Sequence, residues 1–77
     1  MNKERRKKLA CVISKLQDNA GILMAIQEEE QMAFDNLPEG LQTSEKGEKM
    51  EEAVSQLEGA ISQIEDIAQD LEELCLN

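Results

Sequence analysis

Apolar residues in the last third of the chain recur at alternating steps of four and three residues. This main row consists of Met50, Val54, Leu57, Ile61, Ile64, Ala68, Leu71 and Cys75. Such heptad spacing is typical of a helix that packs along its whole length. A second row runs beside it at intervals of seven: Ala53, Ala60, Ile67 and Leu74. The apolar stripe is therefore wider than a two-stranded seam requires, and we expect this helix to contact more than one neighbour.

A similar pattern predicts a first helix over residues 4–36. Its apolar positions are Leu9, Val12, Ile13, Leu16, Ala20, Leu23 and Ile26. The segment from Asp18 to Gly21 resembles a turn, and a break there would make three helices instead of two. Because the apolar row keeps its phase from Leu16 to Leu23, we expect one continuous helix, with at most a bend at Gly21.

The apolar pattern stops between residues 37 and 43, where we expect a turn. Pro38 disfavours helical geometry at the residue before it, and Gly40 permits the chain to reverse. Thr43 or Ser44 is then the N-cap of a second helix over residues 44–75. Gly47 in its first turn allows either a close backbone approach or a soft first turn.

A connection this short makes the two helices antiparallel neighbours. The expected fold is therefore all-α: one helical-hairpin domain over residues 1–77, resembling a coiled coil.

Composition indicates that this hairpin assembles further. The chain has 77 residues, one aromatic residue, no His and two Cys. A monomeric domain of this size usually depends on aromatic residues, disulfides or a metal. We therefore expect a homo-oligomeric helical bundle, held by the wide stripes and by apolar residues outside the main row of the first helix. The predicted interface residues are Ile22, Ala25, Met32, Val54, Ile61, Ile67 and Leu74.

Charge is distributed unevenly along the chain. The net charge is −9, and residues 1–9 hold +4, so the remaining residues hold −13 (−9 − 4). A surface this acidic disfavours direct nucleic-acid binding. Antiparallel pairing sets the basic run from Arg5 to Lys8 beside Asp70, Glu72 and Glu73. We interpret the run as the intramolecular partner of these carboxylates, which also lie at a helix C-terminus.

The sequence predicts a cytoplasmic protein without a membrane partner. No uninterrupted apolar run approaches the roughly 20 residues of a membrane span, and the basic start is not followed by the apolar core of a signal peptide. In a reducing compartment the two cysteines are most simply free thiols. Pairing in the hairpin sets Cys11 near residue 69, so an internal disulfide with Cys75 is not expected.

Catalysis is not expected from this composition. Neither cysteine has a histidine to act as its base, and the carboxylates are spread along helix faces. The four glycines are scattered and form no phosphate-binding loop. We therefore predict no catalytic residue, no metal site and no cofactor.

A ligand site formed between chains is an alternative to a purely structural role. Gln27 and Glu30 fall on or near the apolar row, where burial is costly unless each is paired or hydrated. Either the apolar stripe has rotated by these positions, or a polar cavity opens near the turn. Asn19 either sets the register of a helix seam or contacts a ligand. An anionic ligand requires cations, and a base can stack on the single aromatic ring. The candidate ligand-binding residues are Arg5, Arg6, Lys7, Asn19, Gln27, Phe34, Asn36 and Lys46.

The stretch from Glu28 to Glu48 resembles the turn region of small helical-hairpin proteins from phage and prophage loci. The specific part is Phe34 to Gln42, followed by Ser44-Glu45-x-Gly47. The resemblance transfers no site residues. It implies a non-enzymatic, phage-type binding protein in the cytoplasm of a bacterial host, which counters host defence either by blocking a host protein or by sequestering a small nucleotide signal. Of these two, we favour sequestration of the nucleotide.

Two other functions remain open on the same residues. One is a structural or regulatory coiled-coil adaptor, or an inhibitor that binds a host protein. The other is DNA mimicry by an acidic row that recurs every seven residues: Glu51, Glu58, Glu65 and Glu72.

Overall fold

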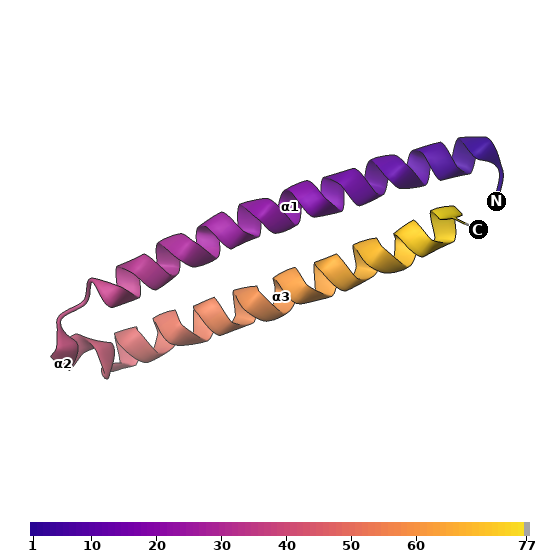
Figure 1. Cartoon of the computed structure of the whole chain (residues 1–77). Helices are drawn as coiled ribbons and strands as arrows, with labels where there is room; N and C mark the ends of the chain where they lie inside the picture. Colours follow the sequence, from indigo (N-terminus) through magenta and orange to yellow (C-terminus); the bar gives the residue numbers. More distant parts are fainter. Residues whose placement is uncertain (77) are drawn as a thin grey trace.

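A computed structural model describes residues 1–76, and within them all the regular secondary structure is helical. Helix α1 covers Lys3–Asp35, the short α2 covers Glu39–Gln42, and α3 covers Glu45–Leu76. Helices α1 and α3 lie side by side, and both chain ends are found at the same end of the molecule (Figure 1). We call this end the open end and the opposite one the turn end. The Cα atoms span 58 × 14 × 12 Å. The prediction of an all-α fold with long helices packed against each other is confirmed.

Helix α1 is continuous through Gly21, as expected from the unbroken apolar phase. At its start, the side chain of Asn2 accepts a hydrogen bond from the backbone N–H of Arg5 at 2.8 Å. This satisfies one of the free N–H groups of the first turn. At its end, the N–H of Asn36 donates to the carbonyl of Met32 at 3.0 Å. The helix therefore begins and ends within one residue of the predicted bounds.

The core is a narrow seam between α1 and α3. Four apolar side chains of this seam are buried, each at most 6% exposed: Ile13 and Ala20 from α1, and Ile61 and Ala68 from α3. Residue numbers joined across the seam sum to 81, as for Gln27 and Val54, so Ile13 lies level with Ala68 and Ile61 with Ala20. Each layer therefore pairs a large side chain with a small one, which lets the two helices pack closely. The side chain of Gln27 donates to the carbonyl of Val54 at 3.1 Å across the seam. This bond resolves the problem of a polar residue on the apolar row.

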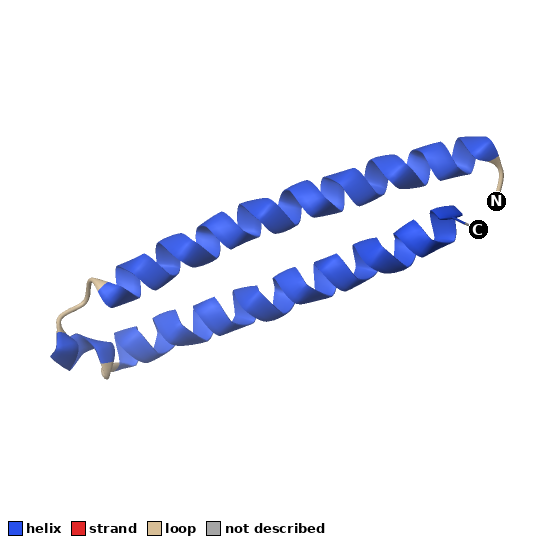
Figure 2. Cartoon of the chain, in the orientation of Figure 1, coloured by secondary structure: helices blue, strands red, loops and turns tan. Residues whose placement is uncertain are grey.

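The predicted turn over residues 37–43 is not wholly irregular, because it contains α2 (Figure 2). The carbonyl of Pro38 accepts hydrogen bonds from the N–H groups of Leu41 and Gln42, at 2.8 and 3.2 Å. Gly40 lies inside this short helix and, like the other glycines, has no positive φ. The chain therefore reverses without a left-handed conformation at Gly40. A single helical turn reverses the chain instead.

The start of α3 is tied closely to α2. The N–H of Gly47 donates to the side-chain oxygen of Ser44 at 3.4 Å, which identifies Ser44 as the cap. Gly47 is buried, and a Cβ placed on it would lie 2.1 Å from the carbonyl oxygen of Gln42. The predicted close approach at Gly47 is confirmed. The side chain of Gln42 also donates to the carbonyls of Phe34 and Leu37, each at 3.3 Å, and so joins the turn to the end of α1.

Candidate functional site

The structure divides the predicted ligand-binding residues between the two ends of the rod. Arg5, Arg6 and Lys7 lie in the first turns of α1 at the open end. Phe34 and Asn36 lie at the turn end, as does Lys46 at the start of α3. Asn19 and Gln27 lie between these groups. Within one chain, these eight residues therefore form no common pocket.

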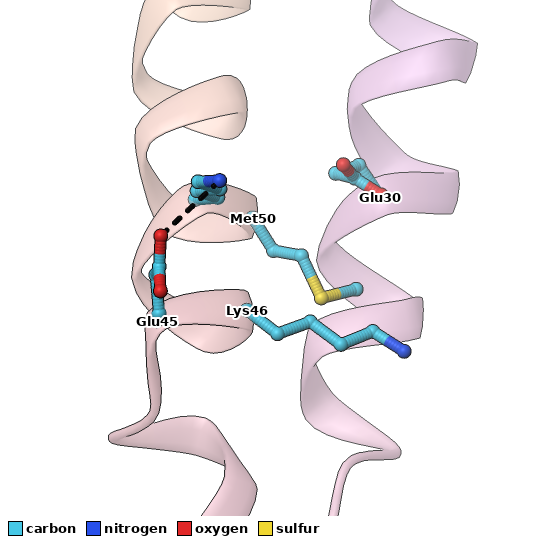
Figure 3. Close-up of a pocket in the computed structure, with 5 residues that line it drawn as sticks. Glu30, Glu45, Lys46 and Met50 are labelled. Carbon is cyan, nitrogen blue, oxygen red and sulfur yellow. Dashed lines mark ion pairs between the residues drawn. The ribbon is translucent and has the colours of Figure 1, made fainter.

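A polar hollow of about 450 Å³ lies at the turn end, lined by Glu30, Glu45, Lys46, Lys49 and Met50. Figure 3 shows Lys46 and Met50 extending from α3 toward α1, with Glu30 on the facing helix. Lys49 pairs with Glu45 at 3.3 Å. This hollow explains how Glu30 is accommodated on the apolar row, because the half-buried Glu30 lines a hollow that is open to solvent. The mixture of two carboxylates and two ammonium groups gives the hollow no strong preference for an anion.

The basic run at the open end does not form the ion pairs predicted for it. Among residues 1–76, the only ion pair joins Lys49 to Glu45 at the other end of the rod. Glu72 instead accepts a hydrogen bond from Gln17 at 3.0 Å. The correction has a simple cause. These charged side chains lie on exposed positions of their helices, where water already solvates them and pairing adds little.

A second hollow at the open end combines cations with an apolar surface. It has a volume of about 270 Å³ and is lined by Met1, Arg5, Lys8, Leu9, Val12 and Leu74. The two positive charges stand beside side chains that are otherwise apolar. A ligand that carries a phosphate and a flat apolar group matches this combination. The volume is slightly below the roughly 300 Å³ of a typical small-molecule pocket, so one chain supplies an open, incomplete site.

The sequence identified only Arg5 among the residues of this hollow. Lys8 belongs to the basic run interpreted as the partner of carboxylates in the second helix. Leu9 and Val12 belong to the apolar row, and Leu74 is a predicted interface residue. The antiparallel arrangement of the two helices could have indicated part of this hollow, because it places Leu74 level with Arg5. Which side of the seam the two side chains share depends on the rotation of both helices, and that requires the tertiary structure.

The predicted interface residues fall into three classes of exposure. Ile61 is 5% exposed within the single chain, so its packing against α1 leaves almost no surface for a second chain, and this assignment is corrected. Val54 is half-buried in the same seam. The others remain exposed: Ile22, Ala25, Met32, Ile67 and Leu74. Exposure reaches 59% for Ile22 and 62% for Met32.

Helix α1 also has the length and composition of a membrane-spanning segment. It contains an 18-residue window with a mean hydropathy of 1.3, only 11% of which is buried in the hairpin. This corrects the expectation that the chain has no segment of this kind. The expectation was based on the length of uninterrupted apolar runs. Mean hydropathy over 18 residues can remain high even when the window contains a charged residue. The observation by itself identifies α1 only as a long helix whose apolar residues are largely uncovered.

Comparisons with protein-family models, with curated proteins and with solved structures find no significant match to this chain.

Proposed function

We propose that this chain is a non-enzymatic binding protein that acts by stoichiometric sequestration of an anionic ligand. The observation that carries the proposal is the hollow at the open end, where Arg5 and Lys8 stand beside the apolar side chains of Leu9, Val12 and Leu74. Cations recognise a phosphate, and an apolar floor accommodates a base. A small nucleotide is the ligand class that combines both features.

The charge pattern supports the same class. The basic residues of the open end form no ion pair within residues 1–76, so their charges are available to a ligand. The rest of the chain is strongly acidic and repels long polyanions such as DNA. A small anion can approach the basic end without meeting that repulsion over its whole length. This favours a nucleotide over a nucleic acid.

The resemblance of the turn region to hairpin proteins of phage loci suggests the biological setting. In that setting the chain would remove a nucleotide signal of host immunity by binding it in equal or greater amount. No turnover is required, which agrees with a chain that lacks histidine. The bacterial cytoplasm is the proposed location.

The experiment is isothermal titration calorimetry with a panel of mono-, di- and cyclic nucleotides. We expect binding to the wild-type chain that weakens by roughly tenfold or more when Arg5→Gln and Lys8→Gln are combined, because two charge-assisted contacts are lost. Lys49→Gln removes a positive charge at the opposite end of the rod, where Lys49 already pairs with Glu45, and serves as the control for Arg5→Gln and Lys8→Gln taken singly. Absence of binding to every nucleotide, or an equal loss in the Lys49→Gln control, would contradict the proposal.

A second candidate function is supported by the exposed apolar side chains. Ile22 and Ile67 are 59% and 51% exposed, which is typical of a helical protein that binds another helix as an adaptor or inhibitor. DNA mimicry is a weaker form of this proposal, since its acidic row is equally typical of a solvated helix face. Co-purification of a host protein with the wild-type chain but not with Ile22→Glu would support the second candidate over nucleotide capture.

A further inference from the structure

One side of the hairpin is apolar along most of its length. We call it the lateral face and define it by Val12, Ile22 and Ile26 of α1 and Ile67 and Leu74 of α3. These side chains are between 44% and 59% exposed. Val12 and Leu74 line one hollow together, which places the edges of both helices on the same side of the seam. In α3, Ile67 and Leu74 continue a row of small residues, Ala53 and Ala60, at intervals of seven.

The other side of the seam is different in character. There, Gln17 lines a shallow hollow with Glu65, Gln69 and Glu72. Glu65 and Glu72 belong to the acidic row that recurs every seven residues in α3. Apolar side chains are fewer on this side: Met24, seven residues after Gln17, is 47% exposed, and Cys75 and Leu76 line a further hollow with Gln17 and Glu72 at the open end. The lateral face is therefore the longer apolar surface and the better suited to further helix packing. A single adhesive face produces a closed pair of hairpins instead of an open polymer.

The size of the lateral face agrees with a stable pair. The rod is 58 Å long, and a strip about 10 Å wide along it corresponds to about 600 Å² on each copy. Two copies would then bury about 1,200 Å² in total, the lower bound of specific protein interfaces. Burying half of this length would fall short of that bound, so the two rods must overlap over most of their length.

Charge selects the relative direction of the two copies. In α1, residues 3–17 carry a net +5 and residues 18–35 a net −5. The half of the hairpin nearer the turn comprises residues 18–60 and carries a net charge of −9. The half nearer the open end comprises residues 1–17 and 61–77 and carries no net charge. Parallel packing would place two −9 halves side by side. Antiparallel packing places each −9 half against a neutral half, and each basic α1 start beside an acidic α1 end.

We propose that the occupant of the lateral face is a second copy of this chain, packed antiparallel to form a four-helix bundle with its two-fold axis near Ile22. Lys15 and Glu29 lie seven residues to either side of Ile22, so each is brought close to the oppositely charged residue of the other copy. Asn19 lies midway between Val12 and Ile26 on the lateral row. A polar residue at such a position sets the register of a helix seam.

The arrangement also completes the incomplete hollow of the open end. The two-fold axis passes near residue 22, so the numbers of α1 residues that face each other across the two copies sum to about 44. The hollow beside Arg5 and Lys8 therefore meets the second copy's turn end, which contains Phe34, Asn36 and Lys46. The cations and the aromatic residue predicted from the sequence lie far apart in one chain and adjoin in the pair. This last step rests on the proposed function, whereas the pairing itself does not.

Cysteine cross-linking tests the direction of packing without any ligand. In a background with Cys11→Ser and Cys75→Ser, Ile22→Cys is expected to form a covalent dimer on mild oxidation, because its two copies meet at the axis. Val12→Cys is the control, since its copies lie about 30 Å apart in the antiparallel pair, beyond disulfide reach. In a parallel pair both variants cross-link, and that result would overturn the proposal.

Light scattering coupled to size exclusion provides the second test. We expect the wild-type chain to have twice its monomer mass of 8.6 kDa. Ile22→Glu combined with Ile67→Glu should weaken self-association by roughly a hundredfold, since two charges are placed on the face of each copy. Met32→Glu changes a side chain that is 62% exposed and lies off the lateral row, so it should leave the dimer intact.

Circular dichroism distinguishes loss of pairing from loss of folding in these variants. A wild-type monomer at about millimolar concentration overturns the proposal. If that monomer also co-sediments with vesicles of phosphatidylcholine and phosphatidylglycerol, the occupant of the lateral face is a membrane surface. Failure of nucleotide binding with the antiparallel cross-link present refutes only the proposed function.

Discussion

Replacing Gly47 by alanine tests the close approach between α2 and α3. Alanine in a helix interior is favoured over glycine by about 1 kcal/mol, because glycine loses more conformational freedom on folding. At Gly47 this gain meets a steric conflict. The new Cβ would lie 2.1 Å from the carbonyl oxygen and 2.6 Å from the carbonyl carbon of Gln42, and 2.7 Å from the carbonyl oxygen of Leu41.

The magnitude follows from what must move. An ordinary contact begins at 3.4 Å, so the backbone of α2 and the start of α3 must separate by about 1 Å. Both conflicting groups are backbone atoms, and no flexible side chain can give way instead. Overpacking of this kind costs about 3 kcal/mol, and subtracting the helix gain leaves a net destabilisation of about 2 kcal/mol.

Gly59 and Gly21 are matched controls, because a Cβ on either meets nothing within 4 Å. Gly59→Ala and Gly21→Ala should each stabilise the fold by about 1 kcal/mol, so the sign of the effect reverses along the chain. The chain has no Trp or Tyr, so urea unfolding is followed by far-ultraviolet circular dichroism, at one protein concentration for all variants. A Gly47→Ala chain as stable as Gly59→Ala would refute the close approach and the reason given for glycine at this position.

Two further substitutions test the seam and the single ion pair. Ile61→Ala should lower the free energy of unfolding by about 3 kcal/mol in urea, because this side chain is only 5% exposed. Met32 is 62% exposed, so Met32→Ala should change that free energy by less than about 1 kcal/mol. Equal effects of the two substitutions would contradict the assignment of Ile61 to the core. Lys49→Ala should change stability by less than about 0.5 kcal/mol, since Lys49 and Glu45 are 73% and 83% exposed; a loss that depends strongly on salt would contradict this.

Periodicity predicted most of the secondary structure, because it reports a local property. The steps of three and four residues require a helix, and a helix with one apolar stripe requires something to cover it. The short polar connection around Pro38 then leaves antiparallel packing as the simplest solution. The cap at Ser44 and the close approach at Gly47 were predictable for the same reason, since both depend on chemistry within a few residues.

Contacts between residues far apart in the sequence were predicted less well. The basic run was assigned to carboxylates of the opposite helix end, yet Glu72 bonds to Gln17 and the cations form no ion pair within residues 1–76. The antiparallel register predicted from the sequence specifies which residues of the two helices lie at the same level along the rod. It does not specify the rotation of each helix about its axis, and this rotation determines which side chains meet.

The sequence by itself determined the two long helices and the row that forms their seam. Tertiary structure alone decided that Ile61 is buried while Ile67 remains exposed, and that Arg5, Lys8 and Leu74 share one hollow. The physical reason is the geometry of a pair of helices. Two helices cover only one side of each other, so a stripe three positions wide retains an uncovered edge, and only the packed pair shows which edge it is.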